Sequence, residues 1–326
     1  MGLKKIGLSI FIAIFFLNAG YMLFFGRETF QVKPSAAQTP KYLYHFVLIS
    51  EEIDNEYWRL VEKGAKTEAD KRHIHLDYLG PKQANNEEQL TLIDKAIAGK
   101  VDGIMTQGLS NEKFNYLVNK SVQKGIPLLT VDTDAPDSER QVYVGSDNYR
   151  AGKLAGEELV KNTQGKQKVG IVTGRLDASN QKLRVKGFED VLAKHKRIQV
   201  AGIEESNITK SGALQATYEL LKNDPDITAF FGTSALDGIG ISQVTSQYQS
   251  KNKPFIISFD TLPETMTLIR TEQINATVGQ YPYQMGEKAV RTLLSVKKGK
   301  LPQPLQYTKT DIIKKTKPTK LWRASR

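Results

Sequence analysis

The chain has 326 residues, about twice the length of an ordinary domain, which predicts two domains or one large α/β unit. With 40% hydrophobic and 25% charged residues it has the composition of a packed globular protein, which excludes wholesale disorder, collagen-like repeats and a polytopic membrane protein. Because the chain has no cysteine, disulfides, thiolate metal sites, a cysteine nucleophile and a lipoprotein anchor are excluded as well.

The net charge of +11 first suggests a nucleic-acid partner, but the excess lies at the two ends of the chain. Residues 1–40 carry +3 and residues 309–326 carry +6, which leaves +2 for residues 41–308. A protein that follows a phosphate backbone needs its basic residues clustered on the fold itself. We therefore expect no nucleic-acid partner.

The N-terminal segment predicts a membrane anchor. Ile6 to Phe25 is a run of 20 uncharged residues, which as a helix spans about 30 Å, the thickness of a bilayer core. The nearest small-residue cleavage motif, residues 35–37, lies some ten residues further on, too far for an ordinary signal peptidase site. We expect a retained single-pass anchor over residues 1–27, a linker over 28–40, and the rest of the chain outside the cytoplasm. A long cleaved signal peptide is the alternative.

From residue 44 onward, short apolar runs alternate with helical patterns. Continuous apolar runs of this length are typical of parallel strands that helices cover on both faces. Helix starts are indicated by Asn86, with two glutamates after it, and by Pro263, with Glu264 after it. The repeated order predicts doubly wound α/β sheets, in which ligands bind beyond the carboxyl ends of the strands. The predicted strands are 45–50, 101–106, 126–131, 169–173, 227–232 and 255–259.

The strand ends carry no catalytic motif. No serine lies in a nucleophile elbow and no glycine-rich run ends in a phosphate-loop lysine, while Gly238 and Gly240 fall inside a helical stretch. His73 and His75 form an H-x-H pair where a helix passes into a strand, and a surface position is favoured over a metal site. We therefore expect no catalytic residues, no cofactor and no metal.

The strand ends do carry side chains that suit a neutral polyol. Carboxylates accept hydrogen bonds from adjacent hydroxyls, a guanidinium donates in a plane, amides and hydroxyls do both, and aromatic faces pack on a sugar ring. Each also has an alternative role: Asp260 as a helix cap, Tyr57 and Trp58 as core, and Arg184 as a solvated helix residue. The candidate ligand-binding residues are Asn55, Tyr57, Trp58, Gln107, Asp132, Arg184, Ser234, Asp260 and Gln280.

Residues 44–312 resemble the type I periplasmic sugar-binding proteins, the family of ribose, galactose and xylose receptors. Several motifs follow one another along the chain in the order in which that family has them. Residues 55–58 are similar to the family's Asn-Pro-Phe-Phe segment, 129–132 to its segment ending in a sugar-binding Asp, and 258–260 to its Gly-Phe-Asp strand end. Residues 144–148 resemble the first crossover between lobes, Arg184 to Phe188 the helix with the ligand arginine, and 277–286 the last crossover.

The departures from the family pattern concern the ligand. In ribose receptors an arginine follows the first ligand Asp, whereas Thr133 stands here. The positions that match a ligand Phe and a ligand Asn hold Asn207 and Ser234, so the resemblance adds Asn207 to the candidates. Ribose is therefore disfavoured, whereas a pentose or a hexose with a different hydroxyl pattern is not. We expect a monosaccharide, most simply a pentose such as xylose.

The resemblance implies two Rossmann-like lobes joined by three hinge crossovers, closing on a sugar. It places the lobes at 41–145 plus 281–308 and at 146–280 plus 309–316, followed by a basic tail at 317–326 that we expect near anionic lipid.

A chain held by one anchor with almost nothing in the cytoplasm cannot signal alone. The chain most resembles membrane-anchored xylose-binding sensor proteins, which implies that it passes its closed state to the ectodomain of a membrane sensor histidine kinase in a two-component system. The alternative is the substrate-binding component of a sugar ABC transporter, with a permease as partner. An enzyme acting on a sugar is disfavoured, because the nucleophile and metal motifs are absent.

Overall fold

The computed structural model describes residues 2–30, 42–248 and 253–315. The chain divides into two units, Met1–Lys41 and Tyr42–Arg326, and the first holds the helix α1 (Leu3–Phe30). Within the described residues, no helix combines the length and the apolar character that crossing a membrane requires. Residues 31–40 of the expected linker and the expected basic tail at 317–326 lie outside the described residues.

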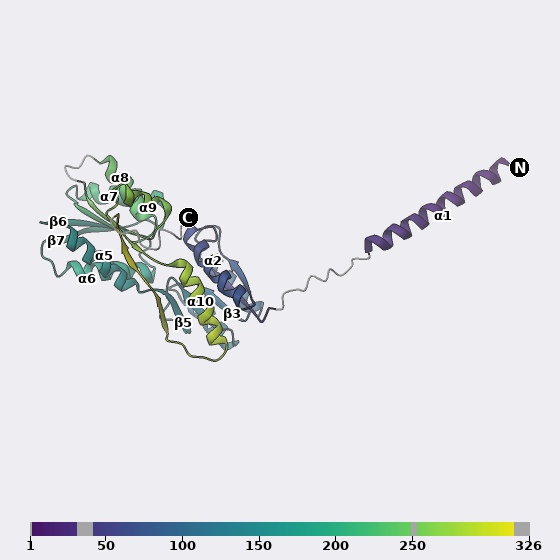
Figure 1. Cartoon of the computed structure of the whole chain (residues 1–326), viewed down its shortest axis with the longest axis horizontal. Coiled ribbons are helices and arrows are strands. Elements are labelled where there is room, and N and C mark those ends of the chain that lie inside the picture. Colours follow the sequence, from purple (N-terminus) through teal and green to yellow (C-terminus); the bar gives the residue numbers. More distant parts are fainter. Residues whose placement is uncertain (1, 31–41, 249–252, 316–326) are drawn as a thin grey trace. The chain divides into compact units, whose positions relative to one another are not determined.

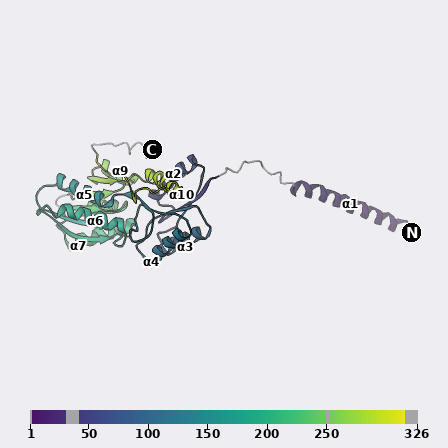
Figure 2. The ribbon, with the colours of Figure 1, turned by 90° about the horizontal axis from the view of Figure 1, so that it is seen from below.

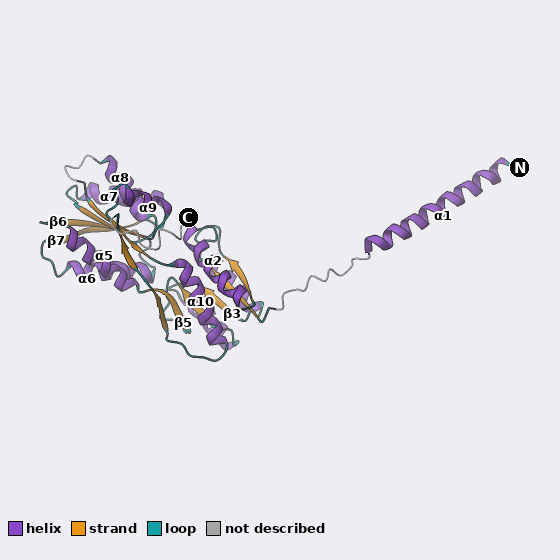
Figure 3. Ribbon diagram, in the orientation of Figure 1, coloured by secondary structure: helices purple, strands orange, loops and turns teal. Residues whose placement is uncertain are grey.

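Within residues 42–248 and 253–315, the second unit contains two sheets of six strands each, which are coloured orange in Figure 3. The first sheet has the order β11-β5-β4-β3-β1-β2, and all of its neighbouring strands are parallel. We call this sheet and its helices the N-lobe. Its strands are β1 (Tyr44–Ile49), β2 (Ile74–Leu79), β3 (Gly103–Thr106), β4 (Leu128–Val131), β5 (Val142–Ser146) and β11 (Leu305–Thr308).

Helices cover both faces of the N-lobe sheet. On one face α2 (Glu56–Lys71) packs beside α10 (Pro282–Lys297), and both contribute to one apolar core (Figure 1). On the other face α3 (Asn86–Ala98) and α4 (Glu112–Gln123) enclose a second core, as the view from below shows (Figure 2). The four central strands β1, β3, β4 and β5 are buried along most or all of their length, because both faces of the sheet are covered.

The second sheet, with its helices, forms the C-lobe. Its order is β12-β10-β9-β8-β6-β7, parallel except for the edge strand β12. Helices α5 (Asn148–Asn162) and α6 (Ser179–Leu192) cover one face. The other face is covered by α7 (Lys210–Asn223), α8 (Asp237–Gln247) and α9 (Pro263–Arg270). The strands are β6 (Gln167–Thr173), β7 (Ile198–Glu205), β8 (Ala229–Gly232), β9 (Phe255–Phe259), β10 (Ala276–Gly279) and β12 (Asp311–Ile313).

Glycines allow the helix pairs of the two lobes to approach closely. A Cβ on Gly64 of α2 would lie 1.9 Å from the carbonyl oxygen of Tyr283 in α10. In the C-lobe, a Cβ on Gly152 of α5 would lie 1.9 Å from the carbonyl oxygen of Arg184 in α6. Only glycine permits these approaches, so Gly152 directly sets the position of the helix that carries Arg184.

The predicted doubly wound α/β architecture of two parallel-sheet lobes is confirmed. The predicted helix starts are confirmed as well: α3 begins at Asn86, with Asn85 as its cap, and α9 begins at Pro263. The chain passes between the two sheets in the segments 146–148, 279–282 and 308–311.

Candidate functional site

Two aspartates occupy equivalent positions in the two lobes. Asp132 follows β4 and Asp260 follows β9, and their amides donate to the carbonyls of Val144 at 3.0 Å and Val278 at 2.9 Å. Both residues have left-handed backbones, with φ of 67° and 64°. Aspartate tolerates this conformation better than most residues, but it still costs free energy, and such strain concentrates at functional sites.

Side chains from both lobes converge on Asp132. The Tyr57 hydroxyl donates to Oδ1 at 2.6 Å and the Thr133 hydroxyl donates to Oδ2 at 3.1 Å. From the C-lobe, Asn180 Nδ2 donates to Oδ2 at 3.3 Å. Asp132 is therefore an N-lobe carboxylate with direct contact to the C-lobe.

Asp260 is buried and linked to the second crossover. Gln280 Nε2 donates to Asp260 Oδ1 at 2.8 Å, and Gln280 Oε1 accepts from the hydroxyl of Ser146 at 2.6 Å. Burial raises the pKa of Asp260 from 3.8 to about 6, because the attraction of Arg184 and the Gln280 hydrogen bond offset only part of the lost solvation. Hydroxyl donors from a ligand would stabilise the charged form.

Arg184 is held in a fixed orientation and is only 2% exposed. Its Nε donates to Asn148 Oδ1 at 2.8 Å and its Nη1 donates to the carbonyl of Thr233 at 2.9 Å. The guanidinium carbon lies 3.8 Å from the centre of the Phe259 ring, a cation–π contact. Because Arg184 is buried, the alternative of a solvated helix residue is ruled out. Its contacts fix the orientation of the guanidinium.

Among the described residues, six buried side-chain oxygens have no hydrogen-bond partner, and two of them belong to candidate ligand-binding residues. These two are Oε1 of Gln107, which follows β3, and Oγ of Ser234, close behind β8. Both side chains are buried, and buried polar atoms are paired in most native structures. These two positions are therefore suited to hydrogen bonds with a ligand.

Further polar contacts, which we did not predict, join the lobes. Arg175 Nη1 lies 3.4 Å from Glu51 Oε1, and the Ser179 hydroxyl donates to the carbonyl of Asp134 at 2.6 Å. Burial raises the pKa of Glu51, and Arg175 acts in the opposite direction. Arg175 and Ser179 follow β6 at its carboxyl end, which is the one sequence signal that could have indicated them.

The structure does not bring every candidate into this group. Asn55 caps α2, with its Oδ1 accepting from the amide of Tyr57 at 3.0 Å. Trp58 packs among the apolar side chains of the N-lobe core, which is the role that we gave above as the alternative to ligand binding. Asn207 is exposed in the loop before α7, on a left-handed backbone with φ of 52°, which accounts for an asparagine there without a ligand.

The group at the strand ends offers no metal-ligand cluster. It is rich in carboxylate, amide and hydroxyl groups but contains no histidine. Within the described residues, the one grouping with metal-ligand geometry is His45, His75 and Asp77, at the opposite end of the N-lobe sheet.

Comparisons with known proteins agree with this architecture. The sequence pattern of the periplasmic binding protein domain matches residues 46–301. The ribose import binding protein RbsB of Escherichia coli K12 is 26% identical over 253 residues, which are 77% of this chain and 84% of that protein.

Two solved structures are also similar. GanP, a glucose-galactose binding protein from Geobacillus stearothermophilus, is 50% identical with a TM-score of 0.82, covering 84% of this chain and 98% of that chain. A chain of the XylFII-LytSN complex is 34% identical with a TM-score of 0.78 over the same shares of the two chains.

Proposed function

This chain belongs to the periplasmic binding protein domain family, and from that premise we propose that it binds one neutral monosaccharide between its lobes and passes the closed state to a membrane partner. Its homologues are sugar-binding proteins and not enzymes. A periplasmic binding domain implies a location outside the cytoplasm. The observation that carries the proposal is the convergence of Asp132, Asp260 and Arg184, from both lobes, at the carboxyl ends of the strands.

The polar group suits sugar hydroxyls in both number and kind. Two carboxylates accept, one fixed guanidinium donates, and the free oxygens of Gln107 and Ser234 each accept one more hydrogen bond. Hydrogen bonds to charged groups contribute about 1.5–3 kcal/mol each, so four or five of them support micromolar affinity after the ordering costs.

Two classes of sugar, a pentose and an aldohexose, are candidates for the ligand. The expectation of a pentose such as xylose stays a prediction, and the XylFII structure at 34% identity is compatible with it. The glucose-galactose binding protein shares 50% of its residues with this chain, which favours an aldohexose. We therefore place glucose and galactose first and xylose second.

We propose a sensor histidine kinase as the membrane partner. The support is the sequence resemblance to anchored sensor proteins, together with the XylFII-LytSN complex, in which a similar chain is assembled with a second protein. Delivery of the sugar to an ABC permease is the second candidate, since RbsB is an import binding protein.

We also propose that residues 1–27 anchor the protein in the membrane. This proposal rests on the sequence alone, on the 20 uncharged residues from Ile6 to Phe25 that follow two lysines. Membrane fractionation and N-terminal sequencing test it. Recovery of a soluble chain that begins beyond residue 35 would identify a cleaved signal peptide instead.

Calorimetry of the full chain in mild detergent, against glucose, galactose, xylose, arabinose and ribose, tests the ligand. We expect one sugar to bind at least about tenfold more tightly than the others, and no heat with any of them would refute the sugar proposal. Sugar-dependent co-purification with a kinase ectodomain would support sensing, whereas co-purification with a permease alone would reverse the order of the two candidates.

A further inference from the structure

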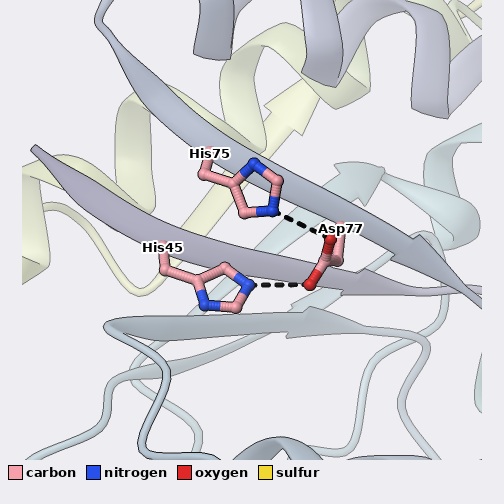
Figure 4. Close-up of side chains that lie close together, drawn as sticks. All are labelled: His45, His75 and Asp77. Carbon is pink, nitrogen blue, oxygen red and sulfur yellow. Dashed lines mark hydrogen bonds and ion pairs between the residues drawn. The ribbon is translucent and has the colours of Figure 1, made fainter. Parts of the chain in front are cut away.

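Two histidines and one aspartate meet on the edge of the N-lobe sheet, away from the proposed sugar site. The parallel pairing of β1 with β2 places His45 beside His75 and Val47 beside Asp77. Side chains alternate along a strand, so His75 and Asp77 share one face of β2 and His45 lies on the same face of β1. Figure 4 shows both imidazole rings directed at the carboxylate of Asp77.

The geometry points to a Zn²⁺ site formed by His45, His75 and Asp77. His45 Nε2 lies 2.7 Å from Asp77 Oδ2, and His75 Nε2 lies 3.1 Å from Asp77 Oδ1. One ligand atom from each of the three residues lies within 4.8 Å of the others. Zinc bonds of about 2.0–2.2 Å in a tetrahedron place ligand atoms roughly 3.3–3.6 Å apart, which small side-chain rotations reach from this arrangement.

The ligand types select the metal. Two imidazole nitrogens with one carboxylate oxygen suit zinc and its neighbours in the transition series, whereas calcium and magnesium prefer sites built from oxygen alone. The three side chains are 41%, 46% and 42% exposed, so they have room to rotate and water can supply the fourth ligand. The histidines need only be neutral for their nitrogens to bind the ion.

Neighbouring residues hold the strand that carries His45. The carboxylate of Asp102 accepts from the His45 amide at 2.9 Å and forms a salt bridge with Lys297 at 3.2 Å. The ring centre of Tyr42 lies 5.1 Å from that of His75. The backbone of His45 is therefore held by a contact that does not involve the proposed ion.

The fold assembles a different histidine pair from the one that the sequence suggested. His73 lies two residues before His75 but is exposed on a left-handed backbone with φ of 56°, outside the cluster. His45 takes its place through strand pairing. An ion here would fasten the edge strand β2 to β1 near the start of both strands, at the end of the sheet opposite Asp132.

Zinc titration of the full chain in mild detergent, by calorimetry, tests the site. We expect one zinc ion per chain, and His45→Gln and His75→Gln should each weaken binding by about a hundredfold or more, since even outer-shell partners contribute 10- to 100-fold. Asp77→Asn should weaken it as well. His73→Asn is the matched control, because asparagine tolerates the left-handed backbone, and it should bind zinc as the natural chain does.

Cobalt provides an independent readout. Co²⁺ in a tetrahedral site absorbs strongly in visible light, and this absorption should appear in the natural chain and in the His73→Asn variant but not in His75→Gln. Sugar affinity should stay the same in all four variants, which separates this proposal from that of the sugar site. Absence of zinc binding at micromolar concentration, or zinc binding that survives both His45→Gln and His75→Gln, would overturn the proposal.

Discussion

Asp260→Asn should stabilise the sugar-free protein at neutral pH while weakening its binding to sugar. Asparagine keeps the tolerance for the left-handed backbone, and its amide oxygen still accepts the Gln280 hydrogen bond. It cannot ionise, however, so the variant avoids placing a charge in a buried position. The two effects have opposite signs, and a merely structural residue would not show this combination.

The magnitude follows from the pKa. The unfolded chain loses the Asp260 proton near 3.8 and the folded chain near 6, so between these values the folded state holds more protons and the free energy of unfolding falls as the pH rises. The contribution of protonated Asp260 to the free energy of unfolding is fully present below pH 3.8 and is lost as the pH rises through about 6. At 1.36 kcal/mol for each pH unit, ionised Asp260 costs the folded state about 3 kcal/mol at pH 7.5.

Urea unfolding of the full chain without sugar measures this cost. At pH 7.5 the free energy of unfolding of the Asp260→Asn variant should exceed that of the natural chain by about 3 kcal/mol. At pH 4 the difference should be less than about 1 kcal/mol. Calorimetry with the preferred sugar should show affinity about tenfold to a hundredfold weaker, because hydrogen bonds to a charged group are lost. Asp137→Asn, at an exposed position, should leave both quantities unchanged. A difference in stability that does not vary with pH, or a less stable variant at pH 7.5, would refute the reasoning.

Three further predictions concern the sugar site, the contact between the lobes and the helix packing. Arg184→Lys keeps the charge but loses the planar pair of contacts, so calorimetry should show about tenfold or more weaker sugar binding. Arg175→Ala removes the salt bridge between the lobes, and X-ray scattering should show the open form favoured by at most about fivefold, while Lys186→Ala, in a bridge within α6, should change nothing. Gly152→Ala should lower the free energy of unfolding by about 1–3 kcal/mol, whereas Gly99→Ala should change it by less than about 1 kcal/mol.

Each of these predictions has a contrary outcome. Sugar affinity that is unchanged by Arg184→Lys would mean that Arg184 only supports the packing of the lobe. An Arg175→Ala chain whose scattering matches that of Lys186→Ala would mean that this salt bridge does not affect closure. Equal stability of the two glycine variants would mean that α5 can move away from α6 without cost.

The sequence predicted the central strands better than the edge strands. β3, β4, β8 and β9 are buried along nearly their whole length, so their apolar runs are visible in the sequence. Edge strands such as β2 and β7 have mostly half-buried or exposed side chains, which leave no apolar run to detect. The apolar central strands were therefore predictable and the edge strands were not.

The candidate site was predictable only as far as the sheet topology determines it. Asp132, Asp260 and Gln280 follow strands, and the carboxyl ends of parallel strands meet at one edge. The contacts of Arg175 and Asn180 depend on how closely the two lobes approach, which no local pattern encodes. The pairing of His45 with His75 depends on the register of two strands that are separated by a helix.

The hydrogen bond from Ser146 to Gln280 joins the first crossover to the second, and Gln280 also contacts the carboxylate of Asp260. One amide therefore belongs both to the hinge and to the proposed sugar site. A protein engineer who stiffens or loosens this hinge to build a biosensor will alter sugar affinity with the same substitution. Under the proposed function, the range of the response and the affinity for sugar therefore cannot be tuned independently at Gln280.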